Sequence, residues 1–114
     1  MRRGDVYWVA FDPSVGAEAR KTRPAVIVSN DGFNRAAESL GRGVVTVVPL
    51  ASSTDRVRSF QVLVPASGNM RNDSKAQCEQ VKGADVSHFG RLIATLPDKV
   101  MADIDAALRL HLAL

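Results

Sequence analysis

The chain has 114 residues and a formal net charge of +3; 46% of its residues are apolar and 24% are charged. This length predicts a single domain, residues 1–114, with its own hydrophobic core, and the composition excludes a disordered chain. The longest apolar runs are far shorter than the roughly 18 residues that cross a bilayer, so we expect no membrane insertion. The N-terminus lacks the pattern of a secretory signal, and we therefore expect a cytoplasmic protein.

Arginine supplies eleven of the fifteen cationic residues. Its planar guanidinium suits phosphate groups. The C-terminal segment holds Asp98, Asp103 and Asp105, so the rest of the chain is more basic than the net charge suggests. A polyanionic partner fits this distribution, although a solvated basic surface explains it about as well.

The first predicted element is a β-strand over residues 5–11 (DVYWVAF), which is rich in β-forming residues. Two apolar sets alternate along it, so both faces should be covered: Val6, Trp8 and Ala10 on one face, and Tyr7, Val9 and Phe11 on the other. Residues 12–23 predict an exposed loop, because turn residues are followed by charge. Residues 24–29 (PAVIVS) predict a short buried strand, with Pro24 at its start. The next segment predicts a short helix that is capped by Asn30 or Asp31 and ends before Gly41.

The middle of the chain alternates predicted strands with polar loops. Strands are expected at residues 43–50, 60–65, 78–85 and 91–96, and loops at residues 51–59 and 66–77. A longer C-terminal helix should follow, with Thr95 as its cap and Pro97 in its first turn. Its apolar face comprises Val100, Met101, Ile104, Ala107, Leu108 and Leu112. Five or six short strands with these two helices predict a compact, mainly β (α+β) barrel.

Metal chemistry has little support in the sequence. Asp103 and Asp105 are two residues apart on a helix and point in different directions, and no HExxH motif is present. His88 and His111 fall on different elements, so a two-histidine acid–base scheme is disfavoured. A single cysteine, Cys78, cannot form an intramolecular disulfide, and we expect it to pack in a strand. We expect no metal and no cofactor.

Three segments gather arginine, lysine, carboxylate and hydroxyl side chains. These are Glu18, Arg20, Lys21 and Arg23 in the first; Ser52, Ser53, Thr54, Arg56 and Arg58 in the second; and Glu79, Gln80 and Lys82 in the third. Arginine with a carboxylate and hydroxyls can process a phosphodiester without a metal, because the cation stabilises developing charge while the other groups position atoms or move protons. A solvated loop surface is the alternative interpretation of the same residues.

The motifs RGDVYWVAFDPSVGAEARKTRPAVIVSNDGFN, VVTVVPLASS and CEQVKGAD, in this order, resemble the MazF/PemK family of toxin–antitoxin endoribonucleases. The resemblance runs over nearly the whole chain, and its N-terminal part is the most specific. It implies an SH3-like β-barrel with a C-terminal helix. It also implies a homodimer that cuts single-stranded RNA at short sequences without a metal and is neutralised by a cognate antitoxin. Independently of the resemblance, the apolar faces of the short strands and of the C-terminal helix exceed what so small a barrel can cover, so we expect a twofold dimer with RNA in the groove between the subunits.

The resemblance also assigns roles to particular residues. Arg23 aligns with the family's catalytic arginine, Glu18 with an acidic position of its first loop, and Gln80 with a position in its RNA-binding groove. Where many relatives carry a threonine in the second loop, this chain has Ala51, so Ser52 is the first candidate for the missing hydroxyl. We therefore expect Arg23, Glu18 and Ser52 to be catalytic. RNA-binding residues are expected to include Arg20, Lys21, Ser53, Thr54, Arg56, Gln80 and Lys82.

Two other functions stay open on the sequence. One is a non-enzymatic gyrase poison of the CcdB kind on the same barrel, acting through the C-terminal helix. The other is a basic nucleic-acid-binding module that does not cleave. Arg23 with neighbouring loop hydroxyls favours the nuclease, whereas Ala51 weakly favours a binder.

Overall fold

The computed structural model describes residues 1–11 and 22–114. Within these residues lie the following strands and helices: β1 (Asp5–Ala10), β2 (Thr22–Ile27), α1 (Asp31–Leu40), β3 (Val44–Ala51), β4 (Gln61–Val64), β5 (Ser74–Gln77), β6 (Lys82–Asp85), β7 (Phe89–Thr95) and α2 (Asp98–Leu112). Two short 3-10 turns, η2 (Cys78–Gln80) and η3 (Val86–His88), flank β6. Among the described helices, none is long and apolar enough to cross a membrane.

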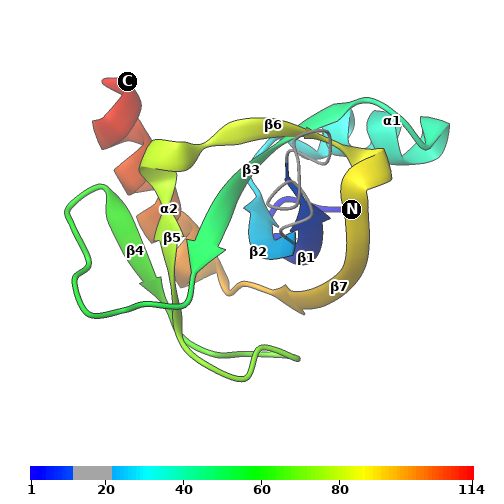
Figure 1. Ribbon diagram of the computed structural model, residues 1–114. Helices are drawn as coiled ribbons and strands as arrows, with labels where there is room; N and C mark the ends of the chain where they lie inside the picture. The colour runs from blue at the N-terminus through cyan, green and yellow to red at the C-terminus, as the bar shows by residue number, and fades with distance from the viewer. Residues whose placement is uncertain (12–21) are drawn as a thin grey trace.

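The strands form one strongly curved antiparallel sheet in the order β4-β5-β3-β2-β1-β7, with β6 paired to β3. Strand β3 is central to the sheet. Along one of its edges, its first half pairs with one strand and its end pairs with another. Residues Val44–Val47 pair with β6, whereas Leu50 and Ala51 pair with β5. Figure 1 shows the strands bending around the interior, with α2 beside β4 and β5 and with α1 at the opposite end. This architecture confirms the predicted α+β class.

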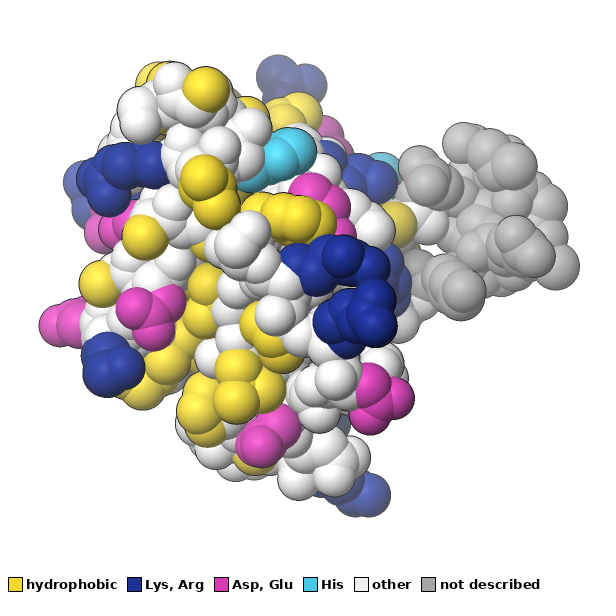
Figure 2. Space-filling model, turned by 90° about the vertical axis from the view of Figure 1, so that its left-hand side faces the viewer, with side chains coloured by type: hydrophobic (Ala, Val, Ile, Leu, Met, Phe, Trp, Pro, Cys, Tyr) yellow, Lys and Arg dark blue, Asp and Glu magenta, His cyan; other side chains and the backbone are white. Residues whose placement is uncertain are grey.

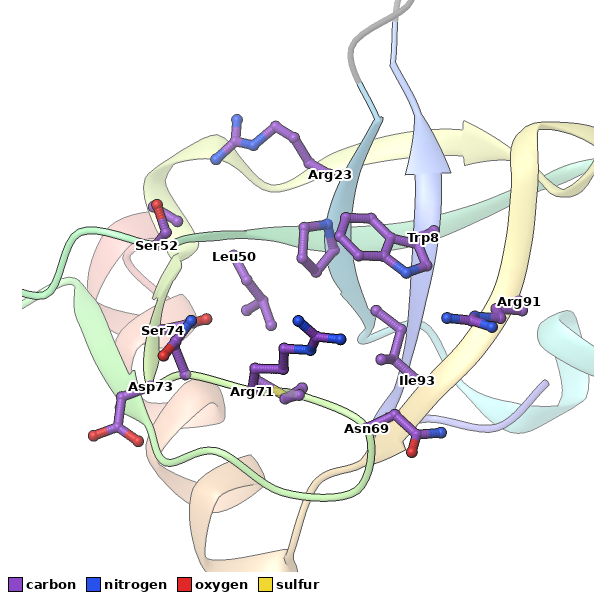
Figure 3. Close-up of a pocket in the computed structure, with 14 residues that line it drawn as sticks. Trp8, Arg23, Leu50, Ser52, Asn69, Arg71, Asp73, Ser74, Arg91 and Ile93 are labelled. Atoms are coloured by element: carbon purple, nitrogen blue, oxygen red, sulfur yellow. The ribbon is translucent and has the colours of Figure 1, made fainter.

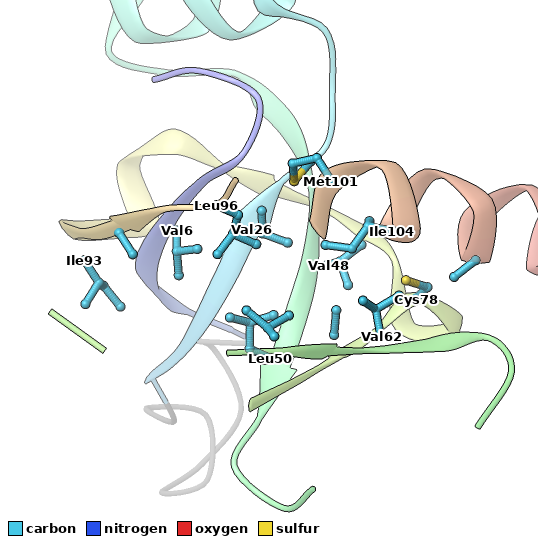
Figure 4. Close-up of a cluster of buried hydrophobic side chains, with 14 residues drawn as sticks. Val6, Val26, Val48, Leu50, Val62, Cys78, Ile93, Leu96, Met101 and Ile104 are labelled. Atoms are coloured by element: carbon cyan, nitrogen blue, oxygen red, sulfur yellow. The ribbon is translucent and has the colours of Figure 1, made fainter. Parts of the chain in front are cut away.

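The core consists of two apolar clusters that lie on opposite faces of β1. Val6 belongs to one cluster, with Trp8 packed against it, and Val9 belongs to the other, with Tyr7 and Phe11 packed against it. The predicted two-sided strand is therefore confirmed. The first cluster also contains buried side chains from β2, β3, β4, β5, β7 and α2, and they are drawn in Figure 4. It holds α2 against the sheet through Met101 and Ile104.

Helix α1 begins and ends as the sequence predicts. Asn30 is the N-cap, and its side-chain oxygen accepts a hydrogen bond of 3.0 Å from the backbone N–H of Phe33. Gly41 follows the helix with φ = 69°, a left-handed conformation that glycine adopts without a steric penalty.

Helix α2 corrects two expectations. Thr95 does not cap it, because Thr95 is the last residue of β7 and its hydroxyl donates to Asp5 Oδ1 at 2.9 Å; Pro97 occupies the N-cap position. The predicted apolar face is confirmed for Met101 and Ile104, which are buried, but Leu112 is 48% exposed. The C-terminal end of the helix extends beyond the sheet that covers its middle.

Two further segments differ from the sequence-based expectation. Ser74–Gln77, expected to be the end of a loop, forms β5 between β3 and β4. Cys78–Gln80, expected to be part of a strand, is a 3-10 turn that connects β5 to β6. Cys78 is fully buried as expected, but in this turn. Burial, with a smaller contribution from the charge of Glu79, raises the pKa of its thiol to about 11, so the group stays protonated and unreactive near neutral pH.

Arg3 links the N-terminus to three other parts of the chain. Its backbone N–H donates to Asp31 Oδ1 at 2.7 Å, and its Nε donates to the Val28 carbonyl at 2.9 Å. Its guanidinium also forms an ion pair with Asp105 on α2. The hydrogen bond from Arg3 N is the main reason why the pKa of Asp31 lies below its ordinary value.

We expect Arg3→Ala to lower the free energy of unfolding by about 1–3 kcal/mol, because two side-chain hydrogen bonds, one of them to a carboxylate, are lost. Urea denaturation of the variant measures this loss. Arg42→Ala is the matched control, since Arg42 is exposed just after α1 and the same charge is removed. Equal stability of the two variants would show that Arg3 does not link these elements energetically.

Candidate functional site

A pocket of about 650 Å³ opens where six segments of the chain meet. Figure 3 shows its lining side chains. They come from β1, β2, the end of β3, the loop between β4 and β5, the start of β5, and β7: Trp8, Arg23, Pro24, Leu50, Ala51, Ser52, Asn69, Met70, Arg71, Asn72, Asp73, Ser74, Arg91 and Ile93. Of the three catalytic candidates, Arg23 and Ser52 line this pocket.

Arg23 lies on the second residue of β2, opposite Val9 of β1. The strand starts at Thr22, so the expectation that Pro24 begins it is wrong by two residues. The proline is tolerated because β3 pairs with β2 only from Ala25 onward, which leaves one side of the strand without a ladder at Pro24. Arg23 is therefore part of the sheet and not of a loop. Its Nη2 donates to Gln77 Oε1 at 2.6 Å, which fixes the guanidinium at the pocket rim.

Ser52 follows the last residue of β3, and both it and Ala51 line the pocket. Ala51 is still paired in the sheet, opposite Lys75 of β5, whereas Ser52 is exposed. In Figure 3 the Arg23 side chain extends along the rim toward the end of β3 where Ser52 lies. The structure thus places a guanidinium and a hydroxyl on one side of the same pocket.

The loop between β4 and β5 forms the opposite wall and is attached to β7. The backbone N–H of Asn69 donates to the Ile93 carbonyl at 2.8 Å. Gly68 permits this approach, because it has φ = +54° and a Cβ atom there would lie 2.8 Å from the Ile93 oxygen. Asp73 Oδ1 accepts from the backbone N–H of Ala66 at 2.9 Å. These contacts position Arg71 over the pocket.

Strand β7 contributes Arg91 and Ile93 through irregular pairing with β1. Its register shifts twice: Tyr7 pairs with Leu92, Val6 with Ala94, and Val9 with Phe89. Each shift gives β7 one residue more than β1, so that Gly90 and Arg91 both lie opposite Trp8. Such bulges redirect side chains and are frequent beside active sites.

The pocket is electropositive. Arg23, Arg71 and Arg91 line it, and Asp73 is its one carboxylate among the described lining residues. Figure 3 shows the Asp73 carboxylate turned away from the centre, whereas Arg71 extends into the middle. Guanidinium groups stabilise the negative charge that develops on phosphate oxygens, and a hydroxyl can add one oriented hydrogen bond. The arrangement suits a phosphodiester held at the rim near Arg23.

The other predicted site residues lie elsewhere or outside the described residues. Glu18, Arg20 and Lys21 fall in the undescribed segment 12–21. Ser53, Thr54, Arg56 and Arg58 are exposed in the loop after β3 and do not line the pocket, and Gln80 is exposed in the 3-10 turn. Lys82 places its Nζ 4.7 Å from the centre of the Phe11 ring, a cation–π contact.

Trp8, Arg71 and Arg91 were not predicted as site residues. Neither the loop that carries Arg71 nor the strand that carries Arg91 shows a sequence motif that marks a site residue. Within the described residues, no group of three or more His, Cys, Asp or Glu side chains could hold a metal ion.

A curved antiparallel sheet with a basic pocket defines a small β-sheet protein whose site chemistry suits a polyanion. Comparison with known proteins identifies its family. A family model described as PemK-like, MazF-like toxin of type II toxin–antitoxin systems matches residues 2–112. The chain belongs to this family.

Two curated relatives come from Mycobacterium tuberculosis. The chain is 45% identical over 115 residues to a protein named endoribonuclease MazF9, covering 100% of this chain and 98% of the relative. It is 40% identical over 97 residues to one named probable endoribonuclease MazF1, covering 85% and 97%.

Solved structures confirm the predicted fold. An endoribonuclease in complex with its cognate antitoxin, from a mycobacterial species, superposes with a TM-score of 0.78 at 22% identity, over 100% of this chain and 96% of that one. MazF from Deinococcus radiodurans superposes with a TM-score of 0.78 at 23% identity, over 100% and 97%.

Proposed function

We propose that the chain is the toxin of a type II toxin–antitoxin system and cleaves single-stranded RNA without a metal. The observation that supports this most is the placement of Arg23 and Ser52 on one side of a pocket that three arginines make electropositive. The family match and the relatives named endoribonucleases favour this function over a gyrase poison or a binding module without cleavage. We place this activity in the cytoplasm.

Cleavage would proceed by attack of a ribose 2′-OH on the adjacent phosphorus. The new P–O bond forms as the bond to the 5′-oxygen breaks, leaving a 2′,3′-cyclic phosphate and a free 5′-OH. Arg23 would stabilise the negative charge on the non-bridging oxygens of the transition state, with its guanidinium held by Gln77. Ser52 would donate a hydrogen bond to the same phosphate. The 2′-OH proton would pass to a base, for which Glu18 in the first loop is our candidate, and the departing 5′-oxygen would take up a proton from water.

A cleavage assay in EDTA tests this function. The purified protein is incubated with a mixed single-stranded RNA in excess chelator, and the products are resolved on a denaturing gel. Discrete fragments are expected from the nuclease. An RNA that is bound but intact would indicate the binding module, and an RNA that is neither bound nor cut would leave the gyrase poison as the better assignment.

We further propose that an acidic, disordered antitoxin segment binds Arg20, Lys21 and Arg23. A positively charged surface that binds RNA also attracts such a segment, which can fold as it binds. Double charge reversal, Arg20→Glu with Lys21→Glu, should weaken the antitoxin complex at least about tenfold, measured by calorimetry at fixed salt. The double variant Arg35→Glu with Arg42→Glu is the control. If the antitoxin still inhibits the toxin while the first loop remains free to bind RNA, this assignment is wrong.

A homodimer is the proposed assembly, and a groove between β4 and α2 offers the interface. This groove, of about 430 Å³, is lined by Ser59, Gln61, Val62, Leu63, Asp103, Ala106, Ala107 and Leu110. Leu63 and Leu110 are 47% and 59% exposed, and β4 is an edge strand that pairs only with β5 among the described strands. Figure 2 shows hydrophobic side chains gathered on this face of the molecule, with charged ones around them.

Leu110→Asp should therefore dissociate the dimer. Each exposed leucine that becomes buried stabilises an interface by about 1.5–3 kcal/mol, and a twofold dimer buries two copies. The dissociation constant of the variant dimer should therefore be higher than that of the wild type by about 10²-fold or more. Light scattering across a concentration series measures it. Leu40→Asp, at an exposed position on α1, is the matched control. A wild-type monomer at micromolar concentration, or a Leu110→Asp dimer as tight as the wild type, would contradict the proposal.

A further inference from the structure

The pocket has apolar walls that phosphate binding does not require. Trp8, Leu50 and Ile93 line it together with Pro24 and Met70, and its volume lies within the range of about 300–1,000 Å³ that is typical of small-molecule sites. A phosphate group is fully polar and gains nothing from such walls. A nucleobase has two flat faces that stack on aromatic and apolar side chains, which is how proteins hold the splayed bases of single-stranded RNA.

Two arginine side chains, Arg71 and Arg91, line this apolar space. Neither Arg71 nor Arg91 makes a hydrogen bond or an ion pair with another described residue, in contrast to Arg23, which is held by Gln77. Figure 3 shows Arg71 reaching into the pocket and Arg91 beside Trp8. A guanidinium only donates hydrogen bonds, in a planar fork that matches two neighbouring acceptors.

The edges of the four RNA bases differ in how well they match this fork. Guanine presents O6 and N7 next to each other, and cytosine presents O2 and N3, so each offers two adjacent acceptors. Adenine places its amino group beside N7 and N1, and uracil places N3–H between O2 and O4. In both of these bases a donor would face the donors of the arginine. The pocket chemistry therefore favours guanine and cytosine.

We propose that this pocket binds one unpaired guanine or cytosine base of the substrate RNA, stacked against Trp8 and held by the guanidinium fork of Arg71 or Arg91. These arginines would then be specificity-determining residues, while Arg23 and Ser52 engage the phosphate at the rim. This inference rests on the proposed function for the identity of the ligand, but base binding in the pocket can be measured without cleavage.

The chain has a single tryptophan, so its fluorescence reports on the pocket directly. The wild-type protein is titrated with 5′-GMP, 5′-CMP, 5′-AMP, 5′-UMP and ribose 5-phosphate at fixed ionic strength. We expect GMP and CMP to change the Trp8 emission with dissociation constants about tenfold lower than those of AMP and UMP. Ribose 5-phosphate, which carries the phosphate without a base, should leave the emission unchanged. Equal binding of all four nucleotides, or none, would overturn the proposal.

Arg71→Gln and Arg91→Gln identify the residue that carries the fork. At least one variant should lose the preference for GMP and CMP, whereas Arg35→Gln, which removes an exposed charge on α1, should keep it. Thermal unfolding confirms that each variant is folded. Retention of the wild-type preference by both pocket variants and by the double variant would overturn the assignment of these arginines.

Cleavage of a randomised RNA pool separates this inference from the proposed function. The wild type should cut where guanine or cytosine occupies one fixed position near the scissile bond, and the arginine variant should cut without that preference. If RNA is cut but nucleotides do not perturb Trp8, the base pocket is wrong and the nuclease stands. If GMP and CMP bind but RNA is never cut, the nuclease is wrong and the base pocket stands. An acidic peptide that perturbs Trp8 when no nucleotide does would overturn the base pocket in favour of a protein ligand.

Discussion

Arg23→Ala is expected to reduce metal-independent RNA cleavage by at least about 10³-fold. Arginines that neutralise a phosphoryl transition state contribute on this scale, and preorganised donors contribute about 10²–10³-fold each. Arg23 is the pocket cation for which the structure shows a fixing partner, Gln77 at 2.6 Å. The side chain is half-buried at a strand end and outside both apolar clusters, so the fold should survive its loss. Single-turnover cleavage of one RNA in EDTA measures the effect.

Two companion variants refine this result. Arg23→Lys keeps the charge but loses the planar fork, and we expect it to stay well below the wild-type rate. Arg35→Ala removes an exposed charge of the same kind from α1 and should leave the rate unchanged. If a folded Arg23→Ala protein cleaves RNA at the wild-type rate, Arg23 takes no part in the mechanism.

The second large effect is expected at the end of β3. Ala51 and Ser52 both line the pocket, whereas Ser53 does not, and this favours Ser52 as the hydroxyl that replaces the family threonine. Losing a hydrogen bond that is made only in the transition state costs about 10²-fold in rate. Ser52→Ala should therefore lower the cleavage rate by about this factor. Ala51→Thr should raise it, because it adds a second hydroxyl at the pocket wall.

Ser53→Ala is the matched control for this pair, since the same hydroxyl is removed one residue farther along the exposed loop. Its rate should equal that of the wild type. If Ala51→Thr has no effect and Ser52→Ala cuts at full speed, the end of β3 supplies no catalytic hydroxyl, and Arg23 would act with Glu18 alone.

The sequence predicted those parts of the fold that depend mainly on the spacing of apolar side chains along the chain. The alternation along β1 placed Val6 and Val9 on opposite faces, and both are fully buried in separate clusters. The cap at Asn30 and the stop at Gly41 were also predictable, because each acts through its own local geometry. Strand β5 escaped prediction because its residues are mainly polar, and its pairing with β3 and β4 outweighs their weak strand preference.

The site was predictable only where the chain carries a recognisable motif. Arg23 and Ser52 lie in such motifs, and the structure brings them to one pocket. Arg71 reaches that pocket because the loop that carries it is hydrogen-bonded to β7 at Ile93, and Arg91 because β7 is bulged opposite Trp8. Both causes are tertiary: a long-range backbone hydrogen bond and a register shift leave no trace in local composition. Thr95 is a further example, because its position resembles that of a helix cap. Its hydroxyl donates instead to Asp5 on the neighbouring strand β1, a long-range contact that local sequence does not reveal.

A single 2′-deoxy substitution tests whether the ribose 2′-OH is the nucleophile. Two RNA oligonucleotides of one cleavable sequence are compared in excess EDTA, one all-ribose and one with a 2′-deoxy residue on the 5′ side of the scissile phosphate. We predict that the all-ribose strand yields a fragment whose mass corresponds to a terminal 2′,3′-cyclic phosphate, and that the substituted strand stays intact. Equal cleavage of both strands, or no cleavage of either, would contradict a nuclease that uses the ribose hydroxyl as its nucleophile and works without a metal.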